Sequence, residues 1–300
     1  MIPFQTLCSL MAIVFGLLCF TPKLMAQTPE ESQQDPSEDL IDETPVSSPS
    51  SENRAYWIGF SASNYDYREP NLMQVKGYMA GVNAGYAHKL SETDVLQAQG
   101  GLHGGSLYYS GALQDEQGGK TPYETSGDKY SMVDFSGLYK GLTNWTENFH
   151  TLAFVGIGLR YTLDIKDNVY DYERQITHWY VPFGVEFQLP VTEQLDVGAV
   201  VELDFMLRGS TDTKLGEINS RYNNVKFRQN AGSGYRLGVN ATYALADQRA
   251  LLFDFSFRKW SVAKSPAEYV GLDEFGKELY GIEPQNETET WMATVGFAFL

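Results

Sequence analysis

The sequence predicts an all-β fold, a closed antiparallel up-and-down transmembrane β-barrel of about ten strands. From Ala55 onward, apolar residues alternate with small or polar residues in ten stretches, and the connectors between them are alternately short and long. In the last stretch, Trp291, Val295 and Phe297 fall on one face of the strand. A strand with one oily face and one polar face suits a closed sheet with lipid outside and water inside.

Residues 1–26 are predicted to be a signal peptide. Leu7 to Phe20 is an apolar run that is too short to span a bilayer as a helix. The sequence Leu24-Met25-Ala26 then offers a cleavage site before Gln27, with a small residue just ahead of the cut.

Both cysteines, Cys8 and Cys19, lie inside this segment. Lipid attachment at Cys19 is the weaker alternative, because Leu18 precedes the cysteine where a small residue is expected. Cleavage at Ala26 leaves a mature chain without thiols, which excludes disulfides and cysteine-based metal or nucleophile chemistry. The sequence predicts no cofactor.

Residues 27–53 form an acidic segment rich in Pro, Ser, Glu, Asp and Gln. Such a composition cannot bury enough apolar surface to offset the entropy of ordering, so we expect a disordered linker. The segment contributes to a formal net charge of -16, which makes nucleic-acid binding a poor hypothesis for this chain.

Residues 54–300 are predicted to form the barrel as one domain. In the seventh stretch, Val201, Leu203 and Phe205 alternate with Glu202 and Asp204, and the other stretches follow the same one-sided pattern. The predicted strands are 55–67, 74–89, 94–110, 129–141, 148–164, 174–189, 194–208, 226–245, 249–263 and 289–300.

The connectors predict the topology of the barrel. Tight turns are expected at 91–93, 143–145, 190–193 and 246–248, and longer loops at 68–73, 111–128, 165–173, 209–225 and 264–288. Barrels of this kind keep short turns on the periplasmic side and long loops outside. Because the strand number is even, both termini and the acidic linker are expected in the periplasm.

A soluble β-sandwich or lipocalin-like barrel is the structural alternative, with its oily residues pointing inward. Against it, aromatic residues recur at one end of the predicted strands, as in an interfacial girdle. These are Tyr56, Tyr86, Tyr139, Phe149, Phe187, Tyr243 and Phe299.

Several predicted strands exceed the nine to eleven residues that cross a bilayer. At about 3.3 Å per residue and a tilt of about 40°, fifteen residues rise roughly 38 Å, against an apolar band of about 25 Å. We therefore expect the wall to project beyond the outer leaflet, which directs the search for function outward.

The mature region resembles the small, porin-like or OmpA-type outer-membrane β-barrels of Gram-negative bacteria, in an uncharacterised subfamily. The final strand, with Phe297, Phe299 and Leu300, resembles the C-terminal signal read by the barrel-assembly machinery, and the family usually ends on the aromatic residue itself. The string from Tyr65 to Pro70 is also similar to strings in uncharacterised barrels. The resemblance implies outer-membrane lipid, lipopolysaccharide and the assembly machinery as partners.

Length and strand number also resemble the omptin proteases. That resemblance implies an acidic pair facing an Asp–His pair at the outer rim. No Asp-x-Asp stands near the tops of the second or third predicted strands, and no Asp-x-His occurs in the sequence. The protease activity is therefore not expected from the match in size.

Ionisable residues on the inward face are predicted to form a network of ion pairs in the lumen, where buried charges must satisfy one another. Two of them, His178 and Asp204, are expected at similar heights and could form a general base. A narrow conduction path is the other alternative. The predicted network comprises Arg160, His178, Glu202, Asp204, Arg236, Asp254 and Arg258.

Three further segments invite specific interpretations. The glycines of 100–105 lack the strand-to-helix context of a phosphate loop, so we expect them to permit curvature or leave room for a bulky neighbour such as Trp57. The loop 164–173 is acidic but lacks the spacing of a calcium site, and no metal site is predicted. The loop 269–285 mixes aromatic and acidic residues, which suits a binding patch or a cover over the barrel mouth.

The sequence favours a non-enzymatic outer-membrane barrel whose outer loops contact another surface, such as an external protein, or support envelope integrity. A narrow pore for small solutes is the first alternative, and a surface-facing outer-membrane hydrolase is the second.

Overall fold

The computed structural model describes residues 54–114, 119–146, 149–165 and 172–299. The predicted signal peptide, the acidic linker and Leu300 lie outside the described residues, and so does most of the loop 164–173.

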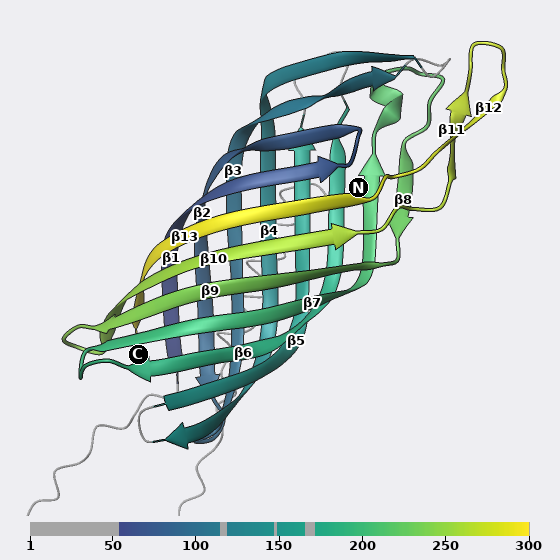
Figure 1. Cartoon of the computed structure of the whole chain (residues 1–300). Coiled ribbons are helices and arrows are strands. Elements are labelled where there is room, and N and C mark those ends of the chain that lie inside the picture. The colour runs from purple at the N-terminus through teal and green to yellow at the C-terminus, as the bar shows by residue number, and fades with distance from the viewer. Residues whose placement is uncertain (1–53, 115–118, 147–148, 166–171, 300) are drawn as a thin grey trace, which may run out of the picture. The chain divides into compact units, whose positions relative to one another are not determined.

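Ten long strands form a closed antiparallel barrel, as predicted (Figure 1). Each strand pairs with its neighbours in sequence, β1 pairs with β13, and β6 pairs with β7. The strands are β1 (Arg54–Glu69), β2 (Met73–Lys89), β3 (Asp94–Gln114), β4 (Lys120–Thr146), β5 (Phe149–Ile165), β6 (Arg174–Pro190), β7 (Leu195–Thr213), β9 (Gly232–Ala244), β10 (Arg249–Val262) and β13 (Asn286–Phe299).

We call the end of the barrel that carries Arg54, Phe299 and the tight connectors the turn end, and the opposite end the loop end. Short elements extend the loop end: the 3-10 helix η1 (Leu215–Glu217), the strand β8 (Val225–Gln229) beside β7, and a hairpin of β11 (Glu268–Leu272) and β12 (Glu278–Gly281). Figure 1 shows this hairpin projecting from the loop end. Within the described residues, no helix is long and apolar enough to cross a membrane.

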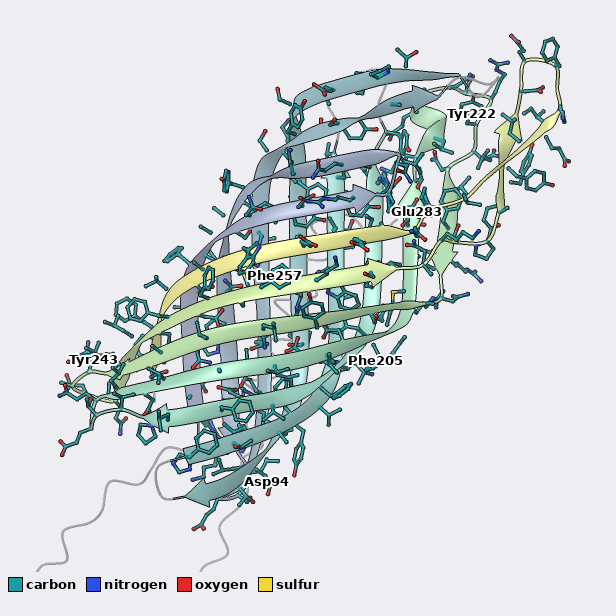
Figure 2. The ribbon with its side chains drawn as sticks, in the orientation of Figure 1. Asp94, Phe205, Tyr222, Tyr243, Phe257 and Glu283 are labelled. Atoms are coloured by element: carbon teal, nitrogen blue, oxygen red, sulfur yellow. The ribbon has the colours of Figure 1, made fainter. Side chains whose placement is uncertain are left out.

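Side chains alternate across the wall as a lipid-facing barrel requires. In β1, Tyr56, Ile58 and Phe60 point outward and are exposed, whereas Ser61 and Tyr65 point into the lumen and are buried. The same outward face carries Phe205 and Phe257 (Figure 2) and other large apolar side chains, namely Val155, Ile157, Val201, Leu207, Val239, Phe253, Phe255, Trp291, Val295 and Phe297. The soluble alternative, with its oily residues inward, is therefore wrong.

Aromatic residues gather at the turn end. Tyr56 lies opposite Phe299 and Tyr86 in the ladder, and the Tyr56 and Tyr86 ring centroids are 4.9 Å apart. Phe149 and Phe187 stack with centroids 6.0 Å apart. Rings in this position match the amphipathic girdle that marks a membrane interface.

Two predicted boundaries, one at each end of β4, are wrong. The expected loop 111–128 is mostly ladder, because Ala112 pairs with Pro122 and the pairing continues past Tyr109 and Thr125. The expected turn at 143–145 is part of β4, which continues to Thr146. Above the bilayer a strand needs no oily face, so the polar residues of 111–114 and 120–128 carry no alternation signal although the two segments pair.

The predicted strand 226–245 is two strands, β8 and β9. The break between Gln229 and Gly232 lies at the level where β7 has an extra residue, Leu207, between the pairs Trp179–Arg208 and Tyr180–Met206. A bulge of this kind interrupts the ladder and bends the strand. Alternation in the sequence does not reveal it, because the residues of β7 that follow Leu207 are polar or glycine and continue no apolar pattern.

Candidate functional site

The lumen has two halves, and the loop-end half is filled by packed side chains. We call this packing the plug; its residues are Tyr65, Tyr67, Val75, Met79, Leu107, Tyr130, Met132 and Ile176. The hydroxyls of Tyr65 and Tyr130 hydrogen-bond at 2.7 Å, which satisfies both in this dry region. Beneath the plug, Tyr180, Met206, Trp260 and Val262 form a second buried cluster. The void between Tyr65, Arg160 and Trp260 measures only about 10 Å³.

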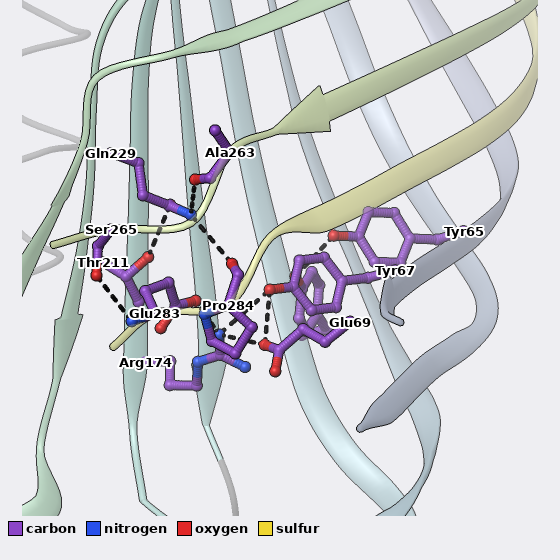
Figure 3. A network of polar contacts seen from close by, with 11 residues as sticks. Tyr65, Tyr67, Glu69, Arg174, Thr211, Gln229, Ala263, Ser265, Glu283 and Pro284 are labelled. Carbon is purple, nitrogen blue, oxygen red and sulfur yellow. Dashed lines mark hydrogen bonds and ion pairs between the residues drawn. The ribbon is translucent and has the colours of Figure 1, made fainter. Parts of the chain in front are cut away.

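The chain on either side of the β11–β12 hairpin crosses the loop-end mouth, and we call residues 263–267 and 282–285 the strap (Figure 3). Its two halves are tied together, because the Glu283 amide donates to Ser265 Oγ at 2.8 Å. Gln229 Nε2 donates to the carbonyls of Ala263 at 3.0 Å and Pro284 at 3.4 Å. These bonds attach the strap to β8 and leave its buried polar groups satisfied.

A buried ionic cluster joins the strap to the barrel wall. Arg174 Nη2 donates to Glu69 Oε1 at 2.9 Å, to the Tyr67 hydroxyl at 3.2 Å and to the Glu283 carboxylate. Tyr67 also donates to Glu69 Oε1 at 2.9 Å. We call Tyr67, Glu69, Arg174 and Glu283 the Arg174 cluster.

Two carboxylates share one guanidinium in this cluster. Burial raises the pKa of Glu283, and nearby Glu69 raises it further, while Arg174 opposes both. Burial also raises the pKa of Tyr172, in the adjoining loop, to about 12. Burial therefore holds the pKa values of both Glu283 and Tyr172 above their ordinary values.

The turn-end half of the lumen holds a cavity of about 320 Å³. Its wall includes the aromatic side chains of Trp57 and Phe154 and the amides of Gln97, Gln99 and Gln188. This volume lies at the lower end of the range for small-molecule sites, roughly 300–1,000 Å³.

Ion pairs surround this cavity. Glu202, which is almost fully buried, accepts hydrogen bonds from Arg236 Nε at 3.2 Å and Nη2 at 2.8 Å and from Arg258. Arg258 Nε lies 3.7 Å from Asp204 Oδ2. Arg160 Nε donates to Asp134 Oδ1 at 2.8 Å. The hydrogen bonds from two arginines, Arg236 to Oε2 and Arg258 to Oε1 of Glu202, compensate much of the cost of removing these charges from water.

The seven predicted lumen residues are not all in one network. The structure brings Glu202, Asp204, Arg236 and Arg258 together and places Arg160 in a separate pair. Asp254 lines the cavity, between Asn240 and Thr294 in the ladder. No ion pair joins Asp254 to any described lysine or arginine.

The expected Asp–His pair does not form. His178 lies opposite Gly209 in the ladder and stacks on Trp260, with ring centroids 5.9 Å apart. Asp204 lies opposite Pro182, nearer the turn end, so no described hydrogen bond joins it to His178. Heights counted from the turns place the two residues too close together, because the actual stagger and the bulge at Leu207 separate them.

No family model and no curated protein matches this sequence. Among solved structures, the outer-membrane protease OmpT of Escherichia coli is similar at a TM-score of 0.52 and 11% identity, over 83% of this chain and 97% of that chain. This protein has the fold of an outer-membrane β-barrel.

Two other solved structures give lower scores. The translocator domain of the autotransporter NalP of Neisseria meningitidis has a TM-score of 0.43 and 11% identity, over 83% of this chain and 88% of that domain. The outer-membrane protein OprG of Pseudomonas aeruginosa has a TM-score of 0.34 and 8% identity, over 82% and 94%. At 11% identity, the likeness to OmpT concerns the fold alone.

Sequence reasoning missed several of the charges that the structure places in the lumen. Asp134 stands directly opposite Arg160 in the β4–β5 ladder, so inward alternation along β4 was a usable signal. Lys140 Nζ reaches Glu186 Oε2 at 2.7 Å across β5, with the Phe154 ring 5.8 Å away. The Arg174 cluster was missed because Glu69 and Glu283 stand in segments predicted as loops.

The glycine prediction needs a correction. Trp57 lies over Gly85 of β2, where an added Cβ would come 2.1 Å from Trp57 Nε1. In the run 100–105, Gly101 faces Asn83 and His103, and Gly105 faces Met79. These glycines do make room for bulky inward side chains, but for those of β2 and β3.

Within the described ranges, no group of three or more His, Cys, Asp or Glu residues has a metal-binding arrangement.

Proposed function

We propose that this protein is a non-conducting outer-membrane barrel that works through its loop end, by contacting other surfaces or by supporting the integrity of the envelope. The observation that carries the proposal is the closure of the loop-end half of the lumen by the plug and the strap. A barrel closed in this way presents a rigid outer platform instead of a route for solutes.

The proposal includes an orientation. The turn end faces the periplasm with both chain ends, the signal peptide is removed after Ala26, and the acidic linker 27–53 stays on the periplasmic side. The exposed outward rings of Phe297 and Phe299 suit recognition by the barrel-assembly machinery during insertion. Outer-membrane lipid and lipopolysaccharide then surround the apolar wall.

The platform has a recognisable surface on the β11–β12 hairpin. Phe275 at its tip is 85% exposed, and Tyr280 and Ile282 are also exposed. Acidic residues Asp273 and Glu278 flank these apolar side chains. Exposed aromatics among charges are typical of protein contact sites.

Planar-bilayer recordings test the closure directly. Refolded full-length protein is expected to show no unitary conductance, because the plug leaves no space for a hydrated ion. Stable, reproducible single-channel steps from properly folded protein would support the narrow pore and contradict the closed barrel. Refolding is checked independently by the heat-dependent shift in gel mobility that folded barrels show.

A loop-end role is tested by shortening the hairpin. In a Gram-negative host that lacks this protein, full-length protein is expected to restore resistance to a bile-salt detergent or to restore surface attachment. A variant with 268–281 replaced by a short glycine-containing turn should not restore it. Full rescue by the shortened variant, at equal outer-membrane amounts, contradicts a role for this platform.

We propose no catalytic role for the lumen. The test is lipid A or peptide turnover in envelopes that carry wild-type protein or His178→Ala. Equal turnover is expected, since His178 packs against Trp260 and has no acidic partner among the described residues. A loss of turnover in the variant would favour the enzyme.

A further inference from the structure

We propose that the turn-end cavity is a binding site for a small organic ammonium compound, with Asp254 as its counter-ion. This inference concerns the opposite end of the lumen from the proposed platform, so it stands or fails independently of the platform.

Among the described residues, the charges of the cavity leave one carboxylate, Asp254, without an ion pair; it has a hydrogen bond to Ser256 instead. Four cations line it, namely Lys140, Arg160, Arg236 and Arg258. Three carboxylates lie on the same wall, namely Asp134, Glu186 and Asp254. Two more, Glu202 and Asp204, lie behind the arginines.

Every one of the four cations is already engaged. Lys140 pairs with Glu186, Arg160 with Asp134, and the two remaining arginines share Glu202. Asp254 is the carboxylate on the wall that has no ion pair with a described lysine or arginine. A carboxylate held at membrane depth is costly unless a cation compensates it, so the wall favours a positively charged occupant.

The rest of the wall suits an organic cation. The side-chain amides of Gln97, Gln99 and Asn240 offer acceptor oxygens for the N–H groups of an ammonium compound. Trp57 and Phe154 supply aromatic surface for its carbon chain and for cation–π contact. A neutral ligand would leave Asp254 without a compensating cation, and an anionic one would find the four cations of the wall already paired with carboxylates.

The arrangement also defines the route of access. Gln188 and Gly296 line the cavity close to the turn-end limits of β6 and β13. Toward the loop end, the space between Arg160, Trp260 and Tyr65 is almost filled. A ligand of this cavity therefore enters from the turn end, which in the proposed orientation is the periplasm.

The experiment is calorimetric titration of refolded full-length protein in detergent micelles. The probes share a four-carbon chain and differ in charge: 1,4-diaminobutane, butane-1,4-diol and succinate. Saturable 1:1 binding is expected for the diamine alone. The diol and the dicarboxylate should bind at least about tenfold more weakly, because a charge-assisted hydrogen bond contributes more than a neutral one.

The variant Asp254→Asn keeps the shape of the side chain and removes its charge. It is expected to weaken diamine binding by at least about tenfold. The control Asp247→Asn removes an exposed carboxylate in a turn outside the cavity, and should bind the diamine as wild type does. If Asp254→Asn does not refold, Asp254→Ser is the second variant.

Three outcomes overturn the proposal. The first is an absence of diamine binding to wild-type protein, and the second is equal binding to wild type and the Asp254 variant. The third is displacement of the diamine by sodium ions at equal concentration, which would make the site one for inorganic cations.

Discussion

The same ten strands line both halves of the lumen, yet one half is packed solid and the other holds a cavity of about 320 Å³. In the loop-end half, Tyr65, Tyr67 and Tyr130 reach across the barrel from β1 and β4. In the turn-end half, Gly101 and Gly296 line the wall instead. Ten strands lie just above the number whose side chains fill a barrel, so the size of the inward residues decides between plug and cavity.

The largest expected effect on stability comes from a substitution at Trp260, which lies at the boundary between the two halves of the lumen. Trp260 is 1% exposed, its ring lies 5.2 Å from that of Tyr180, and the Arg160 guanidinium lies 5.7 Å from it. Replacing Trp260 by Ala should lower the free energy of unfolding by about 4 kcal/mol and widen the void beneath the plug. Urea titration in lipid vesicles measures the first effect, and bilayer recordings detect any conductance.

The outward-facing Trp291 is the matched control, since it packs on Phe257 at a centroid distance of 4.6 Å on the wall. Trp291→Ala should leave the conductance unchanged. If Trp260→Ala costs less than about 1 kcal/mol, the boundary is not packed as described and the comparison between the halves fails.

The next largest expected loss of stability comes from replacing Arg174, and it is confined to the loop end. Arg174→Met leaves Glu69 and Glu283 buried without their cation, which should cost about 3 kcal/mol and release the strap. The control Arg68→Met removes an exposed pair with Asp66 and should cost at most about 1 kcal/mol. Proteolysis of the strap in folded protein distinguishes them, and equal cleavage rates would contradict the role of the cluster.

Most of the barrel could be predicted from the sequence, because lipid on one side imposes a strict alternation that only the wall shows. The wall residues Phe253, Phe255 and Val295 were placed correctly for this reason. The polar end of the β3–β4 hairpin and the polar residues of β7 beyond the bulge at Leu207 show no such alternation, so the sequence does not predict their pairing.

The candidate sites were harder to predict for a different reason. Pairing in the lumen depends on stagger and on side-chain reach across more than one strand. Lys140 and Glu186, two strands apart, cannot be matched from alternation alone. Arg174 and Glu283 are 109 residues apart in sequence and meet only because the strap folds over the mouth.

A glycine substitution in the turn-end half is expected to cause a smaller loss of stability. Gly85→Ala places a Cβ 2.1 Å from Trp57 Nε1, so the ring must move and the barrel should lose about 2 kcal/mol. Gly137→Ala on β4 is the control, because nothing lies within 4 Å of an added Cβ there. Urea titration of both variants measures the difference. Equal stability of the two variants would show that the Trp57 ring can move at little cost, and that the cavity wall is less tightly packed than the plug.

The smallest expected effect is a pH dependence confined to the loop end. Because the pKa of Glu283 is raised by burial above its ordinary 4.5, the folded strap holds a proton more tightly than the unfolded chain does. The stability from this group is fully present below pH 4.5 and is lost as the pH rises through the higher pKa of the folded state. The strap should therefore open more readily at neutral pH than at mildly acidic pH.

Hydrogen exchange of the Ser265 amide, which donates to the Glu283 carbonyl at 2.9 Å, reports this opening once intrinsic exchange rates are corrected for pH. In Glu283→Gln the side chain at position 283 cannot ionise. The protection of the Ser265 amide in this variant should therefore not change with pH between mildly acidic and neutral conditions. Turn-end amides such as that of Leu90, bonded to Asp94, serve as the internal reference and should behave alike in both proteins. Protection of Ser265 that rises with pH in wild-type protein would mean that ionised Glu283 stabilises the strap through Arg174, and that the two carboxylates of the cluster do not compete for it.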